Sequence, residues 1–590
     1  MNRPWNILPP PPPSFEQEFP ELSKTVLGLL YNRNIRTQET IDEFLNPEYS
    51  KNVHDPFLFQ HMTRAVERIF DAIEKKEKII IYGDYDADGV SASVILTDTL
   101  FALGATELDV YLPHRELDGY GLNKKAVNYL HEQQTKVLIT CDCGISNAEE
   151  VALANSLGMD VIITDHHSIP AAIPEAYAII HPKIENEPYP DKHLAGGGVA
   201  FKLAQALLRT HAKSHTVLAN GESHDGFEKW LLDMVAIASV ADMVPLLGES
   251  RTLTKYGLLV LNKTRRIGLL KMLEESGLFQ RDEKTSKPIT ARSIGFVIAP
   301  RINAAGRLDH ANVAYKLLVS DRGDKAQELA WELERNNNER RELTTAYVAD
   351  AVRQVETNQK DEPVLFVHHP EWKTGIVGLI ASRIKDQYQK PTIALAYNGD
   401  ILTGSGRSIT GFNLIGALQQ MPHYFHKFGG HPMACGFSLA DARKRDEFQQ
   451  TLRDFFRTET GGKDMTPPLD IDTEITLDQI NWELYDVLEK FEPFGQQNEK
   501  PSYVAKQLTV VKVETLGKDG AHLKLMVTQG TNPILKKFVG WQLCGDTAKG
   551  DDWCTVLQPG DMVDIVFDIG VNEWNGNREL QLTIVDIKKH

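Results

Sequence analysis

Three acidic residues follow the apolar run 78–82 within the segment GDYDADG, at positions 84, 86 and 88. The apolar run predicts a buried strand, and the next apolar stretch, at 90–103, predicts a helix. The acids therefore stand where a strand ends and a helix begins, which in a parallel sheet is the edge where ligands bind. Carboxylates this close repel one another unless a cation neutralises them. The segment therefore indicates a metal site rather than a solvated acidic turn. A calcium EF-hand loop is excluded, because its twelfth position, counted from Asp84, is Ile95 rather than glutamate.

Five further potential ligands stand at the ends of predicted elements: Asp142, Asp165, His166, His167 and Asp242. The first four follow the strand-like runs 137–140 and 161–164, and the last ends an apolar helix. Each of them alone is more often a cap or a satisfied polar group. Together they form a set of carboxylate and imidazole ligands at one sheet edge, which suits Mn²⁺ or Mg²⁺ better than a structural zinc ion.

The surrounding elements form a pattern of several domains. Strand-like runs alternate with helices from residue 78 to about 180, which predicts a parallel sheet covered on both faces. Mainly helical patterns follow, and a long amphipathic pattern at about 325–355 predicts a helix that bridges two domains. A second α/β unit is expected from 363 to about 460, and short β-type runs from about 470 to 590 predict a small β-barrel.

The composition is that of a globular protein, since 42% of the 590 residues are hydrophobic and 25% are charged. We expect no membrane-spanning segment, because no apolar stretch reaches about 18 residues, and no signal peptide at the proline-rich start. Five cysteines exclude a disulfide framework and indicate a reducing, cytoplasmic setting. The net charge of −17 repels polyanions on average, so a nucleic-acid partner needs a local basic groove.

Motifs spread along most of the chain resemble those of a known superfamily. The segments GDYDADG at 83–89, CDCG at 141–144, TDHH at 164–167 and SVADMVPL at 239–246 together resemble the DHH phosphoesterases. Three more segments, APRINAAGR at 299–307, GSGRS at 404–408 and FGGHPMACG at 428–436, resemble the RecJ branch, which comprises bacterial exonucleases specific for single-stranded DNA. Motif order and spacing match this branch from about residue 70 onward.

The resemblance implies an α/β fold, with two α/β domains joined by a long helix and followed by an oligonucleotide-binding (OB) β-barrel. The expected boundaries are a helical segment at 1–75, a DHH catalytic domain with a parallel sheet at 76–324, a connecting helix at 325–358, a DHH-associated, phosphate-binding domain at 359–462 and the OB domain at 466–590.

The resemblance also assigns roles to the ligand set. Two divalent ions are expected, with Asp86 on one, Asp88 on the other, Asp142 bridging both, and His166 and Asp242 completing the set. Asp84 is expected as an acid that supports the ligands, and His167 as a phosphate contact or proton donor. Tyr82 stands where relatives often carry a histidine ligand. Two ions about 3.5–4 Å apart can activate a water and stabilise both oxygens of an in-line displacement at phosphorus.

Substrate contacts are implied in three places. The expected phosphate donors are Arg301, Asn303 and Arg307 in the first α/β domain and Ser405, Arg407 and His431 in the second. The candidates for contacts to single-stranded DNA in the barrel are Lys512, Lys536, Lys537 and Trp541, each of which could equally be an ordinary surface or core residue.

The expected function is a two-metal, 5′→3′ exonuclease that degrades single-stranded DNA to mononucleotides in recombination and repair. Its expected partners are single-stranded DNA, a single-strand-binding protein and a helicase. A phosphodiesterase for short oligonucleotides or cyclic dinucleotides is one alternative, which the barrel and the length of the chain disfavour. A non-catalytic scaffold that binds single strands is the other, which the intact ligand set disfavours.

Overall fold

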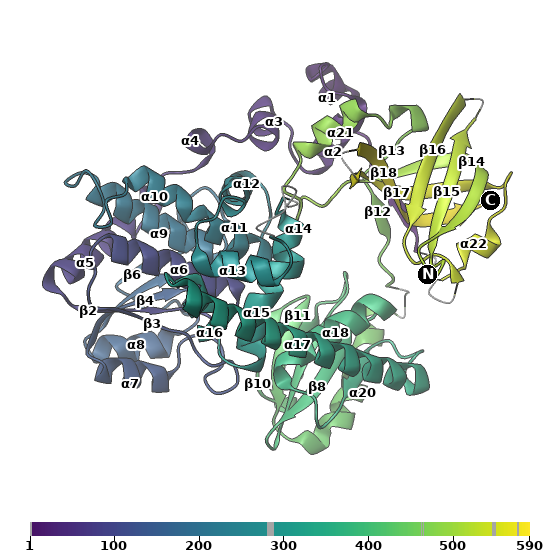
Figure 1. Ribbon diagram of the computed structural model, residues 1–590. Helices are drawn as coiled ribbons and strands as arrows, with labels where there is room; N and C mark the ends of the chain where they lie inside the picture. The colour runs from purple at the N-terminus through teal and green to yellow at the C-terminus, as the bar shows by residue number, and fades with distance from the viewer. Residues whose placement is uncertain are drawn as a thin grey trace. The chain divides into compact units, whose positions relative to one another are not determined.

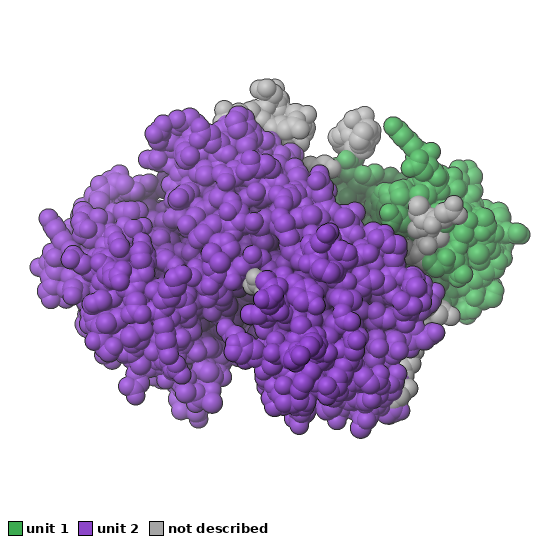
Figure 2. All heavy atoms as spheres, turned by 90° about the horizontal axis from the view of Figure 1, so that it is seen from below, with its two compact units in different colours: residues 1–52, 245–251, 468–590 green, residues 53–244, 252–467 purple. Residues whose placement is uncertain are grey.

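The computed structural model describes residues 3–279, 288–461, 463, 465–530, 532–545, 550–574 and 577–590. The chain forms two compact units (Figure 2). The α/β unit contains residues 53–244 and 252–467, and the barrel unit contains residues 1–52, 245–251 and 468–590. The expected helical segment 1–75 thus falls partly in each unit, and its boundaries stay a prediction. Within the described ranges, no helix is long and apolar enough to cross a membrane.

The first half of the α/β unit is built on a five-stranded parallel sheet of order β3-β2-β4-β5-β6. Its strands are β2 (Lys78–Tyr82), β3 (Leu108–Tyr111), β4 (Thr135–Cys141), β5 (Asp160–Thr164) and β6 (Ala178–Ile180). The helices of this half are α5 (Met62–Lys75), α6 (Ala87–Ala102), α7 (Lys124–Glu132), α8 (Ala148–Ser156) and α9 (Gly196–His211), and they cover both faces of the sheet (Figure 1). The strands and the parallel sheet predicted from the sequence are confirmed.

The register of this sheet brings the motifs together. Tyr82 pairs with Thr140, and Cys141 pairs with Thr164, so β2, β4 and β5 end at the same edge. The three acidic motifs begin directly after these strands. Parallel pairing alone therefore places their side chains side by side.

A helical region and a second sheet complete the α/β unit. Its helices include α10 (His224–Trp230), α11 (Leu232–Ala241), most of α12 (Gly248–Leu261), α13 (Ile267–Glu275), α15 (Ala299–Leu308), α16 (Asn312–Leu318) and the 36-residue α17 (Gly323–Asn358). The second sheet has the order β10-β11-β9-β8-β7, with strands β7 (Leu365–His368), β8 (Thr392–Asn398), β9 (Ile401–Arg407), β10 (Phe425–His431) and β11 (Ala434–Leu439). Helices α18 (Thr374–Tyr388), α19 (Leu414–Gln419) and α20 (Arg445–Thr460) accompany it.

The barrel unit is built on a sheet that closes on itself. The strands β14 (Ser502–Leu516), β15 (His522–Gln529), β16 (Asn532–Gly540), β18 (Asn577–Lys589) and β17 (Met562–Trp574) are neighbours in that order, and β17 pairs back onto β14. Helix α21 (Trp482–Glu489) precedes the barrel, and α22 (Trp553–Val556) lies between β16 and β17. The predicted small β-barrel is confirmed.

The first 52 residues share the core of the barrel. Strand β1 (Trp5–Ile7) pairs in parallel with β12 (Leu469–Ile471), and the helices α1 (Pro13–Glu18), α2 (Lys24–Asn32), α3 (Gln38–Leu45) and α4 (Tyr49–Asn52) follow it. Phe15, Leu29 and Phe44 belong to the same apolar cluster as Phe491 and Phe538. These early helices bury their apolar faces against the end of the chain, so they form part of the barrel unit rather than of a separate segment.

Arg251 ties the segment 245–251 into the barrel unit. Its guanidinium is almost fully buried and donates hydrogen bonds to the backbone carbonyl oxygens of Phe44, Lys490, Phe491, Glu492 and Pro493. Burial lowers the pKa of Arg251 to about 9. Because a guanidinium presents its donors in a rigid fork, this side chain fixes three separate stretches of chain in one position.

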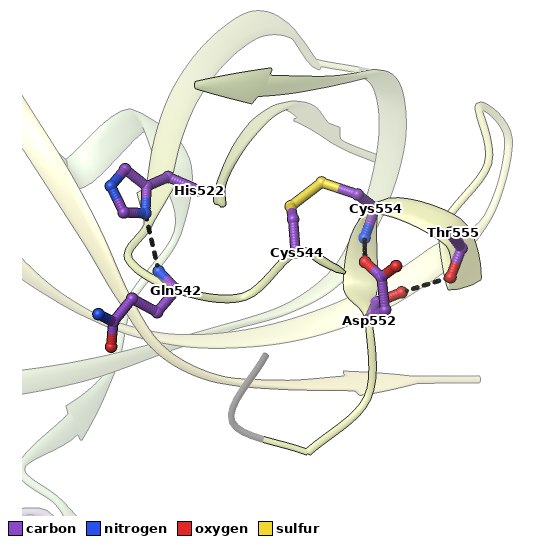
Figure 3. Close-up of a disulfide and its surroundings, with 6 residues drawn as sticks. All are labelled: His522, Gln542, Cys544, Asp552, Cys554 and Thr555. Atoms are coloured by element: carbon purple, nitrogen blue, oxygen red, sulfur yellow. Dashed lines mark hydrogen bonds between the residues drawn. A yellow bond between two sulfur atoms is a disulfide. The ribbon is translucent and has the colours of Figure 1, made fainter. Parts of the chain in front are cut away.

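Two cysteines of the barrel unit form a disulfide, Cys544–Cys554, between the chain that follows β16 and α22 (Figure 3). Their Cα atoms lie 5.2 Å apart. Asp552 caps α22, since its side chain accepts a hydrogen bond from the backbone N–H of Cys554. One local crosslink is not a framework, and the remaining cysteines, Cys141, Cys143 and Cys435, are buried and free.

Candidate active site

Asp86 and Asp88 occupy the start of α6. Asp86 is the N-cap, and its Oδ1 accepts hydrogen bonds from the backbone N–H groups of Asp88 and Gly89, at 3.0 and 3.1 Å. The side chain of Asn303 accepts a hydrogen bond from the N–H of Ala87 at 2.8 Å. The positive end of the helix dipole favours acidic groups at this place. The acidic loop is thus held rigidly by its own helix and by α15.

The N-terminus of α9 approaches the same loop from the side. The backbone N–H groups of Gly196 and Gly197 donate to Asp88 Oδ2 and Oδ1, at 2.8 and 2.6 Å. A Cβ atom on Gly196 would lie 2.6 Å from the Cβ of Asp142, which no real side chain tolerates. Glycine is therefore required here so that two backbone donors can reach a buried carboxylate. The sequence analysis missed this contact, although the triple glycine 196–198 at a helix start was a visible signal.

Asp142 lies at the centre of the ligand set. It follows β4 with a left-handed backbone, at φ 62°, and its side chain is 3% exposed. His166 Nε2 lies 3.1 Å from Asp142 Oδ1, 3.5 Å from Asp242 Oδ2 and 3.6 Å from Asp88 Oδ2. Asp84, Asp86 and Asp142 can bring one carboxylate oxygen each within 4.8 Å of one another. The structure thus brings together every ligand expected from the sequence, and adds Asp84 to them.

Asp165 does not belong to this set but orients the two histidines that follow it. Its Oδ1 accepts hydrogen bonds from the backbone N–H of His166, at 2.7 Å, and from the ring Nδ1–H of His167, at 2.8 Å. Its Oδ2 accepts one from the backbone N–H of Ile145. Burial opposes the charge on both side chains, but the hydrogen bond and the charge attraction between them raise the pKa of His167 to about 9 and hold the pKa of Asp165 well below its usual range.

The electrostatics of the site call for cations. Burial, followed by repulsion from neighbouring carboxylates, raises the pKa of Asp84 to about 8, that of Asp242 to about 7, and those of Asp88 and Asp142 well above the usual range. Burial and the charge of His167 lower the pKa of His166, which favours the neutral imidazole that binds metals.

Unpartnered atoms provide a test of whether metal ions fit. Asp84 Oδ1, Asp142 Oδ1 and His166 Nε2 are buried and have no hydrogen-bond partner among the described residues. Leaving such groups unsatisfied is costly, and divalent ions held by this ligand set would satisfy them. Carboxylate and imidazole donors of this kind suit Mn²⁺ or Mg²⁺, so the residues present fit the expected ions. Tyr82 takes no part, because its buried hydroxyl donates to the carbonyl oxygen of Gly121.

A cluster of guanidinium groups forms the basic part of the α/β unit. Burial, followed by the positive charges of Arg115, Arg340 and Arg407, lowers the pKa of Arg307 to about 9. Arg407 donates to Ser405 Oγ at 2.9 Å, and Arg307 donates to the carbonyl oxygen of Gly375 at 3.0 Å. Like charges at this density are stabilised by an anion such as phosphate. The motifs predicted Arg307, Ser405 and Arg407, whereas Arg115 and Arg340 lie outside them and were missed.

Arg301 and Asn303 make contacts that differ from the expected phosphate contacts. Arg301 is 9% exposed, and it donates to both carboxylate oxygens of Glu334 on α17 and to the carbonyl oxygen of Val297. Its charge is therefore neutralised by an internal partner. Asn303 supports the acidic loop through Ala87, as described above. Both residues hold the frame of the site in this structure, and a contact to substrate stays a prediction.

His431 lies at the end of β10, in the second half of the α/β unit. Burial, followed by the positive charges of His167 and Lys183, lowers the pKa of His431. A contact between His431 and the substrate stays a prediction. Lys183 itself donates to the carbonyl oxygen of His166, and the hydroxyl of Tyr120 lies 3.0 Å from His167 Nδ1. Neither residue carries a motif that could have identified it.

The basic candidates in the barrel are mostly paired within the chain. Lys512 forms an ion pair with Glu514 at 2.6 Å, and Lys537 forms one with Glu579 at 2.7 Å. Lys536 donates to the carbonyl oxygen of Ile480. Trp541 is 49% exposed and packs edge-on against His522. Of the four candidates, Lys512 and Trp541 are exposed, and the role of all four stays a prediction.

Three family models match the chain. They are the DHH family, N-terminal domain, over residues 78–239, the DHHA1 domain over 361–458 and the RecJ OB domain over 471–586. These matches cover the two halves of the α/β unit and the barrel.

Curated relatives match along the whole chain. The single-stranded-DNA-specific exonuclease RecJ of Bacillus subtilis (strain 168) is 35% identical over 588 residues, which cover 99% of this chain and 70% of the relative. The exonuclease of the same name from Dickeya dadantii is 33% identical over 584 residues, 97% of each chain. Among solved structures, RecJ in complex with Mn²⁺ from Thermus thermophilus superposes with a TM-score of 0.82 at 25% identity, covering 100% of this chain and 80% of that one.

Proposed function

The chain belongs to the RecJ family of DHH phosphoesterases, and on this premise we propose that it is a metal-dependent exonuclease that degrades single-stranded DNA. The proposed polarity is 5′→3′, the proposed products are mononucleotides, and the proposed role is in DNA recombination and repair. The observation that carries the proposal is the convergence of Asp142, His166 and Asp242 with the acidic loop at one sheet edge.

The chain itself supplies the ligands for two divalent ions. Asp86 and Asp88 lie at the start of α6, Asp142 lies near Asp86 and His166, and Asp242 is the C-cap of α11. When bound, two such ions supply an activated water and neutralise charge on the phosphate that is cleaved.

Other side chains prepare the substrate. Asp165 fixes the ring of His167 next to Asp142, where it can contact a phosphate oxygen or give a proton to the departing one. Arg307, Ser405 and Arg407 provide a preorganised anion site, in which the donors are already oriented by Gly375 and by one another. This arrangement supports hydrolysis of a phosphodiester rather than binding alone.

Digestion of single strands tests the proposal. Strands of 50 nucleotides, labelled at the 5′ or the 3′ end, are incubated with Mn²⁺, with Mg²⁺ or with chelator, alongside a duplex of the same sequence. We expect mononucleotides from the 5′ end of the single strand with metal and none with chelator. Cleavage of a 3-mer but not of the 50-mer would instead indicate a phosphodiesterase for short substrates, and tight binding without cleavage would indicate a scaffold.

The proposed partners follow from the substrate. Duplex DNA offers a single strand only once it is unwound, so we propose a helicase and a single-strand-binding protein as partners, in the cytoplasm. Adding each to a digestion of duplex DNA tests this proposal. A helicase should release mononucleotides that the nuclease alone does not produce, and an unchanged yield would count against the partnership.

A further inference from the structure

The loop that follows β3, at residues 114–120, is closed by its own hydrogen bonds. The backbone N–H of His114 donates to Asp118 Oδ2, and the N–H of Asp118 donates to the carbonyl oxygen of His114, both at 2.8 Å. The ring Nδ1 of His114 accepts from the backbone N–H groups of Glu116 and Leu117, at 3.2 and 3.3 Å. These bonds make the loop one compact turn, so a contact made by one of its residues also constrains its neighbours.

Two side chains of this loop reach the candidate active site. The guanidinium of Arg115 lies over the ring of Tyr85, 4.1 Å from the ring centre, within the acidic loop 84–88. The hydroxyl of Tyr120 lies 3.0 Å from His167 Nδ1. Arg115 Nε is buried and has no hydrogen-bond partner among the described residues. The ring of Tyr85 and the backbone of the loop therefore determine where this guanidinium lies.

The second half of the α/β unit holds the loop from its other side. The hydroxyl of Thr374, the first residue of α18, donates a hydrogen bond to the carboxylate of Glu116, 258 positions earlier in the chain. The positive end of the helix dipole also favours a carboxylate at this place. Both residues lie outside the motifs that resemble those of the RecJ branch, so sequence reasoning did not single them out.

The start of α18 is itself fixed on α15. Arg307 donates to the carbonyl oxygen of Gly375 at 3.0 Å, and a Cβ atom on Gly375 would lie 2.3 Å from the carbonyl oxygen of Arg307. The two backbones are therefore in direct contact, which only glycine permits at this position. Thr374, the neighbour of Gly375, thus offers the loop a rigid point of attachment.

We propose that the hydrogen bond between Thr374 and Glu116 positions Arg115 for a phosphate of the single strand, so that Thr374 and Glu116 are positioning residues. Arg115 is one of the positive charges around Arg307 that an anion would stabilise. A loop that is already ordered loses less conformational entropy when the substrate binds, which favours binding. This inference rests on the proposed function, since it takes the anion to be the backbone of the single strand.

Steady-state digestion of a labelled 20-nucleotide single strand in Mn²⁺ tests the inference. Thr374→Val keeps the shape of the side chain and removes its hydroxyl. We expect kcat/KM to fall about 3- to 10-fold, the range of one hydrogen bond, mainly through KM, because the metal ligands are untouched. The Mn²⁺ concentration for half-maximal rate should therefore not change, and Thr374→Ser, which keeps a hydroxyl, should restore kcat/KM. Thr357→Val, which removes an exposed hydroxyl bonded within α17, is the matched control and should change neither.

A double-mutant cycle shows whether the hydrogen bond acts through Arg115. Arg115→Ala removes the guanidinium, and in this background Thr374→Val should cause no further loss of kcat/KM. Glu116→Ala removes the same bond from the exposed side of the loop. Because loss of this negative charge alone would favour a phosphate, a raised KM of Glu116→Ala would support the hydrogen bond, and a lowered KM would count against it.

The outcomes separate this inference from the function on which it rests. If the unmodified protein does not digest single strands, both fail. If it digests them, but Thr374→Val and Thr357→Val have the same KM, the inference alone is overturned. A loss that persists at full size in the Arg115→Ala background would also overturn it, because Thr374 would then act through another residue. The unfolding temperatures of Thr374→Val and Thr374→Ser, compared with each other, show whether the fold is intact.

Discussion

Replacing Asp142 by asparagine keeps the shape of the side chain but removes one negative charge from the ligand set. Carboxylate oxygens of this set can lie within 4.8 Å of one another. Two full charges at that distance repel by about 3.5 kcal/mol in an effective dielectric of 20. The raised pKa values of Asp84 and Asp142 show that the metal-free cluster already shares protons, so only part of this repulsion remains to be relieved. We expect Asp142→Asn to raise the free energy of unfolding by at least ~1 kcal/mol in chelator.

The same substitution should have the opposite effect on activity. The asparagine cannot bridge two cations, so turnover of a single strand should fall at least ~10²-fold, as when a group that stabilises developing charge is lost. Mn²⁺ should stabilise the unmodified protein, because it binds only the folded state, and should stabilise the variant less.

Stability is measured by urea unfolding and by hydrogen exchange of the backbone amides of β2 and β4, in chelator and in Mn²⁺. Activity is measured as the initial rate of digestion. Asp361→Asn, a charge removal at an exposed position of the same unit, serves as the control and should leave both quantities unchanged. Destabilisation of Asp142→Asn in chelator would refute the repulsion argument. Unchanged turnover, or an unchanged gain in stability from Mn²⁺, would refute its assignment as a shared ligand.

Three other substitutions test separate parts of the structure. Gly196→Ala places a Cβ atom 2.6 Å from that of Asp142, so it should lower the free energy of unfolding by ~1–3 kcal/mol and remove most of the turnover. The control, Gly323→Ala, meets no atom within 4 Å and should change both quantities little. Equal effects of the two substitutions would show that α9 need not approach Asp142 so closely. His431→Ala should lower turnover about 10- to 10²-fold, as measured by steady-state rates. Its affinity for single strands, measured by fluorescence anisotropy, should fall by a smaller factor. An unchanged rate would remove β10 from the active site. Burial and two neighbouring histidines lower the pKa of His211, so folding stability should fall as the pH drops below the unfolded pKa of ~6.5. His211→Gln should flatten this dependence, as measured by thermal unfolding across the pH range. Parallel curves of unfolding temperature against pH for the two proteins would contradict the prediction.

The sequence was most informative where local pattern and topology coincide. The apolar runs 78–82, 137–140 and 161–164 predicted parallel strands, and the acidic motifs follow each of them directly. Parallel strands of one sheet end at one edge, so the convergence of Asp142 and His166 follows from the sequence pattern alone.

Partners that lie far along the chain could not be predicted in this way. The apolar face of α3 shows that the helix needs a partner, but no local pattern shows that this partner is the barrel about 450 residues later. Arg301 has the residue type of a phosphate donor, and only the three-dimensional structure shows that Glu334 neutralises it. The same holds for Lys537 and Glu579 on neighbouring strands.

The shared core of residues 1–52 and the barrel imposes an order on synthesis. Trp5 donates a hydrogen bond to Asp586, 581 positions later in the chain, and a ribosome that adds 5–20 residues per second needs roughly 30–120 s to cover that interval. Throughout this time the apolar faces of α2 and α3 lack the strands that bury them. The α/β unit, by contrast, ends at residue 467, so most of its chain has been made before the last barrel strand exists. During each round of translation, α2 and α3 are therefore buried only once the barrel strands have been made, long after these helices emerge.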